Sequence, residues 1–123
     1  MNLVDSSGWL EYFADDKNAK HFAPAIENTK ELIVSTINIY EIYKKILVTK
    51  DENFAMEAIA LMYQGEVIDV TSEISIEAAR LSAKENIPMA DSLIYITGRK
   101  NNAIIWTQDY DFKNLDGVKF IKK

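Results

Sequence analysis

The sequence predicts an α/β fold of three layers, in which helices cover both faces of a central, mostly parallel sheet. Short apolar runs of strand character alternate with longer segments whose apolar residues recur at the helical period. Parallel strands need long crossover connections, and these helical segments are long enough to supply them. The 123 residues are 48% hydrophobic and 27% charged, close to ordinary globular values. We therefore expect one domain over residues 1–123.

The expected strands are short, and most of them end in polar residues that favour a turn or the start of a helix. They cover residues 3–4, 32–34, 67–70, 103–106 and 118–121. The first expected helix starts at Asp5-Ser6-Ser7, and the others cover residues 19–28, 37–50, 51–64, 71–86 and 89–100. Gly65 is expected to end the fourth helix as a left-handed C-cap, with Phe54 and Leu61 on the buried face of that helix.

The residue composition limits which side chains can act as nucleophiles or metal ligands. The chain has no cysteine, which excludes disulfides, thiolate zinc sites and thiol nucleophiles and favours an intracellular, cytoplasmic protein. The single histidine, His21, lies in a polar stretch and is expected on the surface. No stretch approaches the roughly 18 apolar residues of a membrane span, so no membrane partner is expected. Oxygen atoms are the metal ligands that remain.

The net charge of −5 does not exclude a nucleic-acid partner. The chain carries 19 acidic and 14 basic residues. If four carboxylates bind divalent cations, 19 − 4 leaves fifteen acids against fourteen bases, and the bound metal offsets the other four.

Three acidic residues are predicted at one edge of the sheet. Asp5 and Asp109 come directly after predicted strands, and Glu41 lies one to two turns into the helix after the second strand. The carboxyl ends of parallel strands meet at one edge, where α/β proteins bind ligands. Asp91 opens a helix that leads into the strand at 103–106, and we expect such a helix to begin at the opposite edge. Topology therefore does not place Asp91 with the others.

Each acid also has a purely structural explanation. Asp5 is a suitable helix N-cap, Asp91 a first-turn carboxylate and Asp109 a turn residue. Glu41 is spaced to pair with Lys45 on the same helix. If the carboxylates share a crevice, however, their repulsion must be offset by shared protons or by a hard cation such as Mg²⁺ or Mn²⁺. Such a cation supports phosphoryl chemistry without histidine or cysteine.

The acids occur in four short segments that follow one another along the whole chain. The segments are Leu3-Val4-Asp5-Ser6-Ser7, Ser35-Thr36 with Glu41, Ala90-Asp91-Ser92-Leu93-Ile94, and Thr107-Gln108-Asp109-Tyr110-Asp111-Phe112. In this order they resemble the acidic motifs of the PIN-domain family and, within it, the small VapC-type toxins of toxin–antitoxin pairs. The combination is a strong signal, although each segment by itself is weak.

The resemblance implies a Rossmann-like PIN fold and a Mg²⁺- or Mn²⁺-dependent endoribonuclease. The residues that it implies as metal ligands are Asp5, Glu41, Asp91 and Asp109. It thereby brings Asp91 into the acidic crevice. It further implies hydrolysis of RNA by a metal-activated water, leaving a 5′-phosphate and a 3′-hydroxyl. The implied partners are an inhibiting antitoxin and a second copy of the chain in a homodimer.

Further residues have predicted roles, and for some of them two roles remain open. The resemblance implies that Ser6 and Thr107 hold carboxylates or the attacking water by hydrogen bonds, whereas Asp111 either supports the site or caps a turn. Trp9 and Tyr12 line either a protein interface, which we favour, or the substrate groove. Four cations either bind the RNA backbone or are simply solvated: Lys44, Lys45, Arg99 and Lys100. Four aromatic residues are expected in the core: Phe13, Tyr43, Phe54 and Trp106.

Three alternatives remain at this stage. A receiver-type signalling domain has a similar length and an acidic magnesium pocket, but Asp5 is followed by Ser6-Ser7 rather than a second acid, and Asp69 lies inside its predicted strand. A non-catalytic PIN module would bind RNA or protein only. A PIN-like nuclease acting outside a toxin–antitoxin pair would process RNA or cut DNA flaps.

Overall fold

A five-stranded, all-parallel sheet forms the centre of the computed structural model, which describes residues 1–123. Its strands are β1 (Asn2–Val4), β2 (Leu32–Ser35), β3 (Glu66–Ile68), β4 (Ile104–Thr107) and β5 (Val118–Phe120). Their order across the sheet is β3-β2-β1-β4-β5. The receiver-type sheet has the order 2-1-3-4-5. The observed order therefore excludes the receiver alternative and confirms the predicted α/β class.

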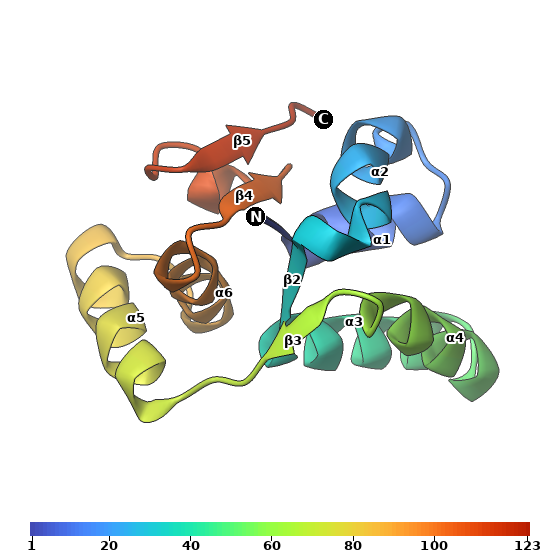
Figure 1. Cartoon of the computed structure of the whole chain (residues 1–123), viewed down its shortest axis with the longest axis horizontal. Coiled ribbons are helices and arrows are strands. Elements are labelled where there is room, and N and C mark those ends of the chain that lie inside the picture. Colours follow the sequence, from blue (N-terminus) through green and yellow to red (C-terminus); the bar gives the residue numbers. More distant parts are fainter.

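Six helices cover the two faces of the sheet (Figure 1). They are α1 (Ser6–Phe13), α2 (Ala19–Glu27), α3 (Thr36–Thr49), α4 (Glu52–Met62), α5 (Ser72–Glu85) and α6 (Met89–Lys100). Two short 3₁₀ turns, η1 (Thr29–Glu31) and η2 (Tyr110–Phe112), precede β2 and follow β4. Four helices begin where the sequence predicts, because a polar side chain accepts a hydrogen bond from a backbone N–H of the first turn. These caps are Asp5, Ser35, Asp51 and Thr71.

The core is divided by the sheet into two clusters. Val4 and Val34 face α1 to α4 and pack with Trp9. Leu3 and Ile33 face the opposite way and pack against α6 and η2. The division follows from the pleat, since successive strand residues point to opposite faces. In Figure 1 the two helix layers lie on either side of the sheet, with α5 and α6 on the left.

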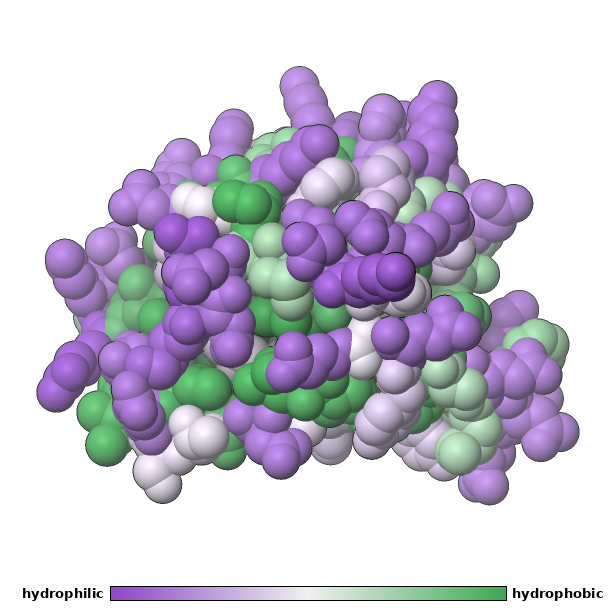
Figure 2. Space-filling view, viewed as in Figure 1, coloured by the Kyte–Doolittle hydropathy of each residue, from purple (hydrophilic) through white to green (hydrophobic).

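The surface seen from the side of Figure 1 is mostly hydrophilic, with apolar side chains between polar ones in its lower half (Figure 2). No helix combines the length and the apolar character that a membrane crossing requires.

Two expectations for α4 are wrong. Gly65 is not a left-handed cap. The helix ends at Met62, its C-cap residue is Tyr63 in right-handed conformation, and Gly65 has no positive φ. The glycine is needed for space instead, since a Cβ there would lie 2.9 Å from both Cγ and the carbonyl oxygen of Leu32. Phe54 and Leu61 are 56% and 41% exposed, respectively, because the buried face of α4 is formed by smaller residues and Met62.

Of the two aromatic residues near Asp5, Trp9 differs from expectation, whereas the expected roles of Tyr12 stay predictions. Trp9 is completely buried in the larger cluster and packs on Phe13 with ring centroids 5.6 Å apart, so it forms neither an interface nor a groove wall. Tyr12 is half-buried, and its hydroxyl donates to Glu27 at 2.8 Å. Phe13, Tyr43 and Trp106 are partly buried against the same cluster, in line with a core role.

Candidate active site

Asp5 is held at the carboxyl end of β1 by hydroxyl groups from two elements. Its Oδ2 accepts hydrogen bonds from Ser7 Oγ at 2.7 Å and from Thr107 Oγ1 at 3.0 Å. The side chain also caps α1 through the Ser7 amide at 3.4 Å. Only 3% of Asp5 is exposed, and this burial raises its pKa to about 6 although the hydrogen bonds act in the opposite direction. Asp5 therefore caps a helix and also lies among the acidic residues.

Thr107 connects Asp5 to Asp109. Its Oγ1 donates to Asp5 and accepts from the Asp109 amide at 2.9 Å, because β1 and β4 are neighbours that end at the same edge. Asp109 in turn caps η2, as its Oδ1 accepts from the Asp111 amide at 2.9 Å. One buried hydroxyl thus sets the positions of two acids.

Asp91 lies at the same edge, contrary to the topological expectation. Helix α6 must deliver the chain to the amino end of β4, so the helix runs antiparallel to the strands and its first turn lies near their carboxyl ends. The error was to assign that first turn to the opposite edge. The crossover from β3 consists of two packed helices, α5 and α6, and α6 makes the return.

Three aspartates form a compact group that we call the aspartate cluster. One carboxylate oxygen from each of Asp91, Asp109 and Asp111 lies within 4.8 Å of the others. Burial raises the pKa of Asp91 to about 8, helped by a hydrogen bond with the Asp111 carboxyl and by the negative charges of Asp5, Asp109 and Asp111. Two half-buried carboxylates and an exposed one that repel one another fit a hard divalent cation with oxygen ligands.

Glu41 is not part of this cluster, and it is hydrogen-bonded instead to Ser6, the residue that follows Asp5. Ser6 Oγ donates to Glu41 Oε1 at 2.7 Å and accepts from Asn38 Nδ2 at 3.0 Å. Asn38 is fully buried and its Oδ1 accepts from the Ser35 amide, which completes a capping box at the start of α3. The chain's two ion pairs do not include Glu41, so the predicted pair with Lys45 does not form.

Residues 3–118 match the family model described as the PIN domain. The chain belongs to the PIN-domain family. Its fold is shared with solved structures at low sequence identity. A chain of a toxin–antitoxin complex from Klebsiella pneumoniae has a TM-score of 0.85 at 16% identity, with 100% of both chains covered. VapC20 of Mycobacterium tuberculosis, a sarcin–ricin loop cleaving toxin, has a TM-score of 0.80 at 18% identity, covering 100% of this chain and 98% of the other.

A chain of the DNA-bound VapBC complex of Salmonella typhimurium aligns with this PIN domain at a TM-score of 0.76 and 13% identity. The alignment covers 99% of this chain and 98% of that one. No curated protein sequence is significantly similar to the chain. The family assignment therefore rests on the sequence match over residues 3–118, and the structural likeness shows that the fold is the same.

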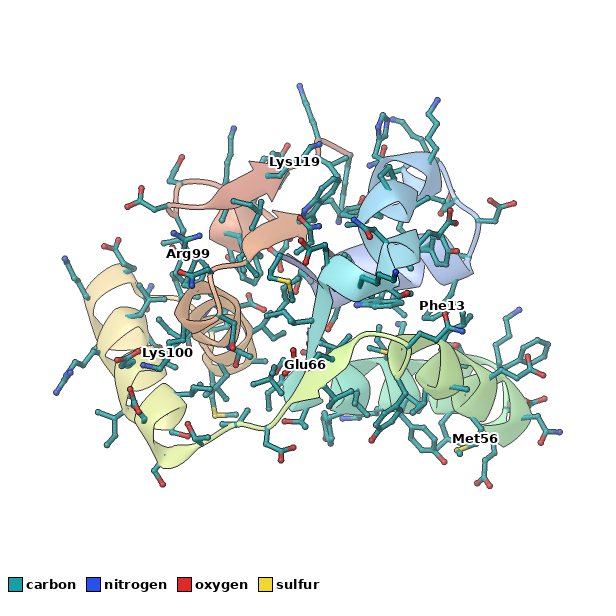
Figure 3. All side chains as sticks on the ribbon, viewed as in Figure 1. Phe13, Met56, Glu66, Arg99, Lys100 and Lys119 are labelled. Atoms are coloured by element: carbon teal, nitrogen blue, oxygen red, sulfur yellow. The ribbon has the colours of Figure 1, made fainter.

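RNA binding is one of two expected roles for four cations, and two of these lie at the far end of α6 from Asp91. Arg99 and Lys100 end α6, about 13 Å along the helix axis from Asp91. Arg99 donates to the Ala103 carbonyl, and Lys100 is paired with Glu73 and Glu77 of α5 (Figure 3).

The two lysines of α3 also have local contacts. The ammonium of Lys44 lies 5.8 Å from the centroid of the Tyr40 ring. Lys45 lines an apolar groove between α1, α3 and α4.

Asn38 is a buried residue of the site that the sequence analysis does not include among its candidates. The signal was present, because a serine three residues before an asparagine at a helix start is a capping-box spacing. Ser7 is likewise expected only as a helix-start residue, whereas the Ser7 hydroxyl forms the shortest hydrogen bond to Asp5.

Proposed function

We propose that this PIN domain is a divalent-metal-dependent endoribonuclease that acts as the toxin of a type II toxin–antitoxin pair. The observation that carries the proposal is the aspartate cluster beside the buried Asp5, at the carboxyl edge of a parallel sheet in a chain that matches the PIN family. The fold it shares with chains of toxin–antitoxin complexes supports the toxin role.

The proposed ligands are Asp5, Glu41, Asp91 and Asp109, and Mg²⁺ or Mn²⁺ is the proposed ion. When bound, such an ion supplies a water of lowered pKa and neutralises charge that develops on the phosphodiester. The chain's own residues prepare the site. Ser6 orients Glu41, and Thr107 holds Asp5 in place. Asp111 shares the cluster with Asp91 and Asp109, and we assign it a supporting role in binding the ion or its water shell.

Cleavage of a labelled single-stranded RNA tests the proposal. We expect cleavage with Mg²⁺ or Mn²⁺, no cleavage with excess EDTA, and products with a 5′-phosphate and a 3′-hydroxyl. Asp5→Asn and Asp109→Asn should each abolish cleavage while retaining the circular dichroism spectrum of the folded protein. Asp15→Asn is the matched control, because Asp15 is exposed and asparagine tolerates its φ of 50°.

Full activity in EDTA or in Asp5→Asn would refute the metal mechanism. Cleavage of single-stranded DNA or of DNA flaps, with RNA left intact, would instead favour a PIN nuclease outside a toxin–antitoxin pair. A folded protein that binds RNA without cutting it would be the non-catalytic module.

The inhibiting partner is proposed to occupy the groove between α1, α3 and α4. This hollow of about 640 Å³ is lined by Leu10, Phe13, Ile46, Phe54 and Leu61 among others. Phe54 is 56% exposed in the free chain, which is a large apolar area for a helix surface to leave in water. An apolar segment of an antitoxin would cover it, and Lys45 and Lys50 at the groove would attract acidic flanks.

Phe54→Asp tests this assignment, because the change affects an exposed side chain and should leave the fold intact. We expect Phe54→Asp to keep wild-type RNA cleavage and to lose inhibition by a co-expressed antitoxin encoded beside this chain. Glu52→Gln, an exposed change on the same helix, is the control. Unchanged inhibition of Phe54→Asp would place the partner elsewhere.

Light scattering of the purified chain tests the proposed homodimer.

A further inference from the structure

Tyr110 is an exposed aromatic residue between two members of the aspartate cluster. It directly separates Asp109 from Asp111 in η2, and 57% of it is exposed. Its ring packs against Phe120 of β5 with centroids 5.0 Å apart at 57°, so a second ring limits its movement. A large apolar side chain that is fixed in place and still exposed beside acidic groups has no role in the core.

Lys113 adds a positive charge at the same place. Its ammonium lies 5.5 Å from the centroid of Tyr110 and 5.6 Å from that of Phe120. Lys119 is the next cation along β5, but it faces Trp106 at 4.1 Å and therefore projects from the other side of the strand (Figure 3). Lys113 is thus the cation that accompanies the tyrosine and phenylalanine pair.

A hollow extends from Tyr110 and Asp111 between η2, α6 and the end of α5. It has a volume of about 360 Å³, and its walls include Leu81, Tyr95 and Leu115. The volume is in the range of small-molecule sites. The Tyr95 hydroxyl is already used, as it donates to the Asp116 carbonyl at 2.6 Å. Glu85, Asn114 and Asp116 also line the hollow, so its walls are partly aromatic and apolar and partly acidic, immediately beside the aspartate cluster.

We propose that Tyr110 is the stacking platform for an unpaired RNA base next to the phosphate that is cleaved, with Lys113 contacting the adjoining backbone. This inference rests on the proposed ribonuclease function and names the feature of the substrate that the site selects. A base stacks on an aromatic ring only when it is free of its own duplex neighbours. The arrangement therefore selects single-stranded segments, such as loops and ends, over paired RNA.

The acidic surroundings explain why an aromatic platform is needed. Phosphates approaching the aspartate cluster are repelled unless a cation is bound, and only one lysine accompanies the platform. Stacking contributes to binding independently of charge and is tolerant of sequence, since every base has a π face. Tyr110 thus holds the strand where electrostatic attraction is weak.

Binding of a short fluorescent RNA in EDTA tests the inference without any cleavage. Tyr110→Ala should weaken binding of the single strand about 5- to 100-fold. Tyr110→Phe should bind like wild type, because the stacking face is kept. The matched control is Tyr63→Ala, since Tyr63 is 59% exposed and lies just before β3, at the amino edge of the sheet. Lys113→Met should lower the slope of log affinity against log salt concentration by about 1, as expected for the loss of one phosphate contact.

Wild-type protein should prefer the single strand over the same sequence in a duplex, and Tyr110→Ala should lose most of this preference. Equal affinity of Tyr110→Ala and wild type, in a protein that cleaves RNA, would overturn the platform and leave the nuclease proposal standing. Tyr110-dependent binding by a protein that never cleaves RNA would keep the platform and overturn the nuclease. Absence of RNA binding by wild type in EDTA would overturn the platform, and absence of cleavage in Mg²⁺ and Mn²⁺ as well would overturn both.

Discussion

Acidic residues occur at the two ends of α6 in opposite electrostatic settings. At its last turn, Lys100 forms ion pairs with Glu73 and Glu77 of α5, and the three side chains are exposed or partly exposed. At its first turn, Asp91 faces Asp109 and Asp111, and its pKa is raised by burial and by the surrounding negative charge. The first group is complete within the chain. The second group stores repulsion that only protons or a cation relieve, which is how a binding site differs from a surface ion pair.

The largest expected difference is between two variants that each remove one negative charge, one at the first turn of α6 and one beside its last turn. Asp91→Asn should lower kcat/KM for RNA cleavage about 1000-fold, because loss of this proposed metal ligand would forfeit several kcal/mol of transition-state stabilisation. Glu77→Gln should leave kcat/KM unchanged. Steady-state cleavage assays at fixed Mg²⁺ measure both. Similar losses in the two variants would show that the ends of α6 do not differ in function.

A smaller effect is expected when the support of the acids is removed. Thr107→Val keeps the volume of a fully buried side chain but removes the hydroxyl between Asp5 and Asp109. We expect Mn²⁺ affinity and activity to fall about 10- to 100-fold. Thr49→Val is the control, because its hydroxyl bonds only to the Lys45 carbonyl on the exposed end of α3. Titration calorimetry measures the affinity, and an unchanged value for Thr107→Val would remove Thr107 from the site.

Without metal, stability should depend on pH through Asp5 and Asp91. Their pKa values of about 6 and about 8 lie above the ordinary 3.8, so the folded protein binds more protons than the unfolded chain in this interval. Their contribution is complete below pH 3.8 and is lost as pH rises through about 6 and about 8. The raised pKa of Asp5 alone corresponds to about 3 kcal/mol of unfolding free energy. With an allowance for solvent screening at the half-buried Asp91, we expect a total loss on the order of 4 kcal/mol.

Urea unfolding in EDTA across this pH interval measures the loss. Asp91→Asn should remove the Asp91 part of the dependence, since the amide does not titrate, and keep the part from Asp5. The variant should be more stable than wild type near pH 8. Saturating Mn²⁺ should restore wild-type stability by about 2.7 kcal/mol at 100 times Kd and should have little effect on Asp91→Asn. Wild-type stability that rises with pH in EDTA would contradict the stored repulsion.

The smallest effect, on thermal stability, is expected at the last turn of α6, where the acids are paired with Lys100. Lys100→Met removes both ion pairs with Glu73 and Glu77, yet exposed pairs contribute little to stability. We expect no measurable change in Tm at physiological ionic strength. Differential scanning calorimetry at low and high salt provides the measurement. A large, salt-dependent drop would mean that the ion pairs stabilise the α5–α6 pair after all.

Local patterns in the sequence predicted most of the fold. The alternation of short apolar runs with helical periods predicted five parallel strands and six helices, and polar caps such as Ser35 and Thr71 placed helix starts within about two residues. Such features depend on neighbours in the chain, where hydrogen bonding and apolar periodicity act over a few residues. Phe54 and Gly65 were misjudged because their surroundings come from distant segments.

The site was only partly accessible to the same reasoning. Strand ends predicted that Asp5, Glu41 and Asp109 share an edge, whereas the return direction of α6 decided where Asp91 lies. The relay from Asn38 through Ser6 to Glu41 joins two helices, and no local pattern specifies which partner a buried amide finds.

By itself, the sequence determined the fold class, the family and an acidic chemistry without cysteine or a histidine cluster. Only the tertiary structure decided that Asp111 joins Asp91 and Asp109, that Trp9 is core, and that Tyr110 stands exposed beside the acids. The reason is physical: residue type and spacing set local conformation and available donors, but charge repulsion, burial and aromatic contact arise between segments that only folding brings together.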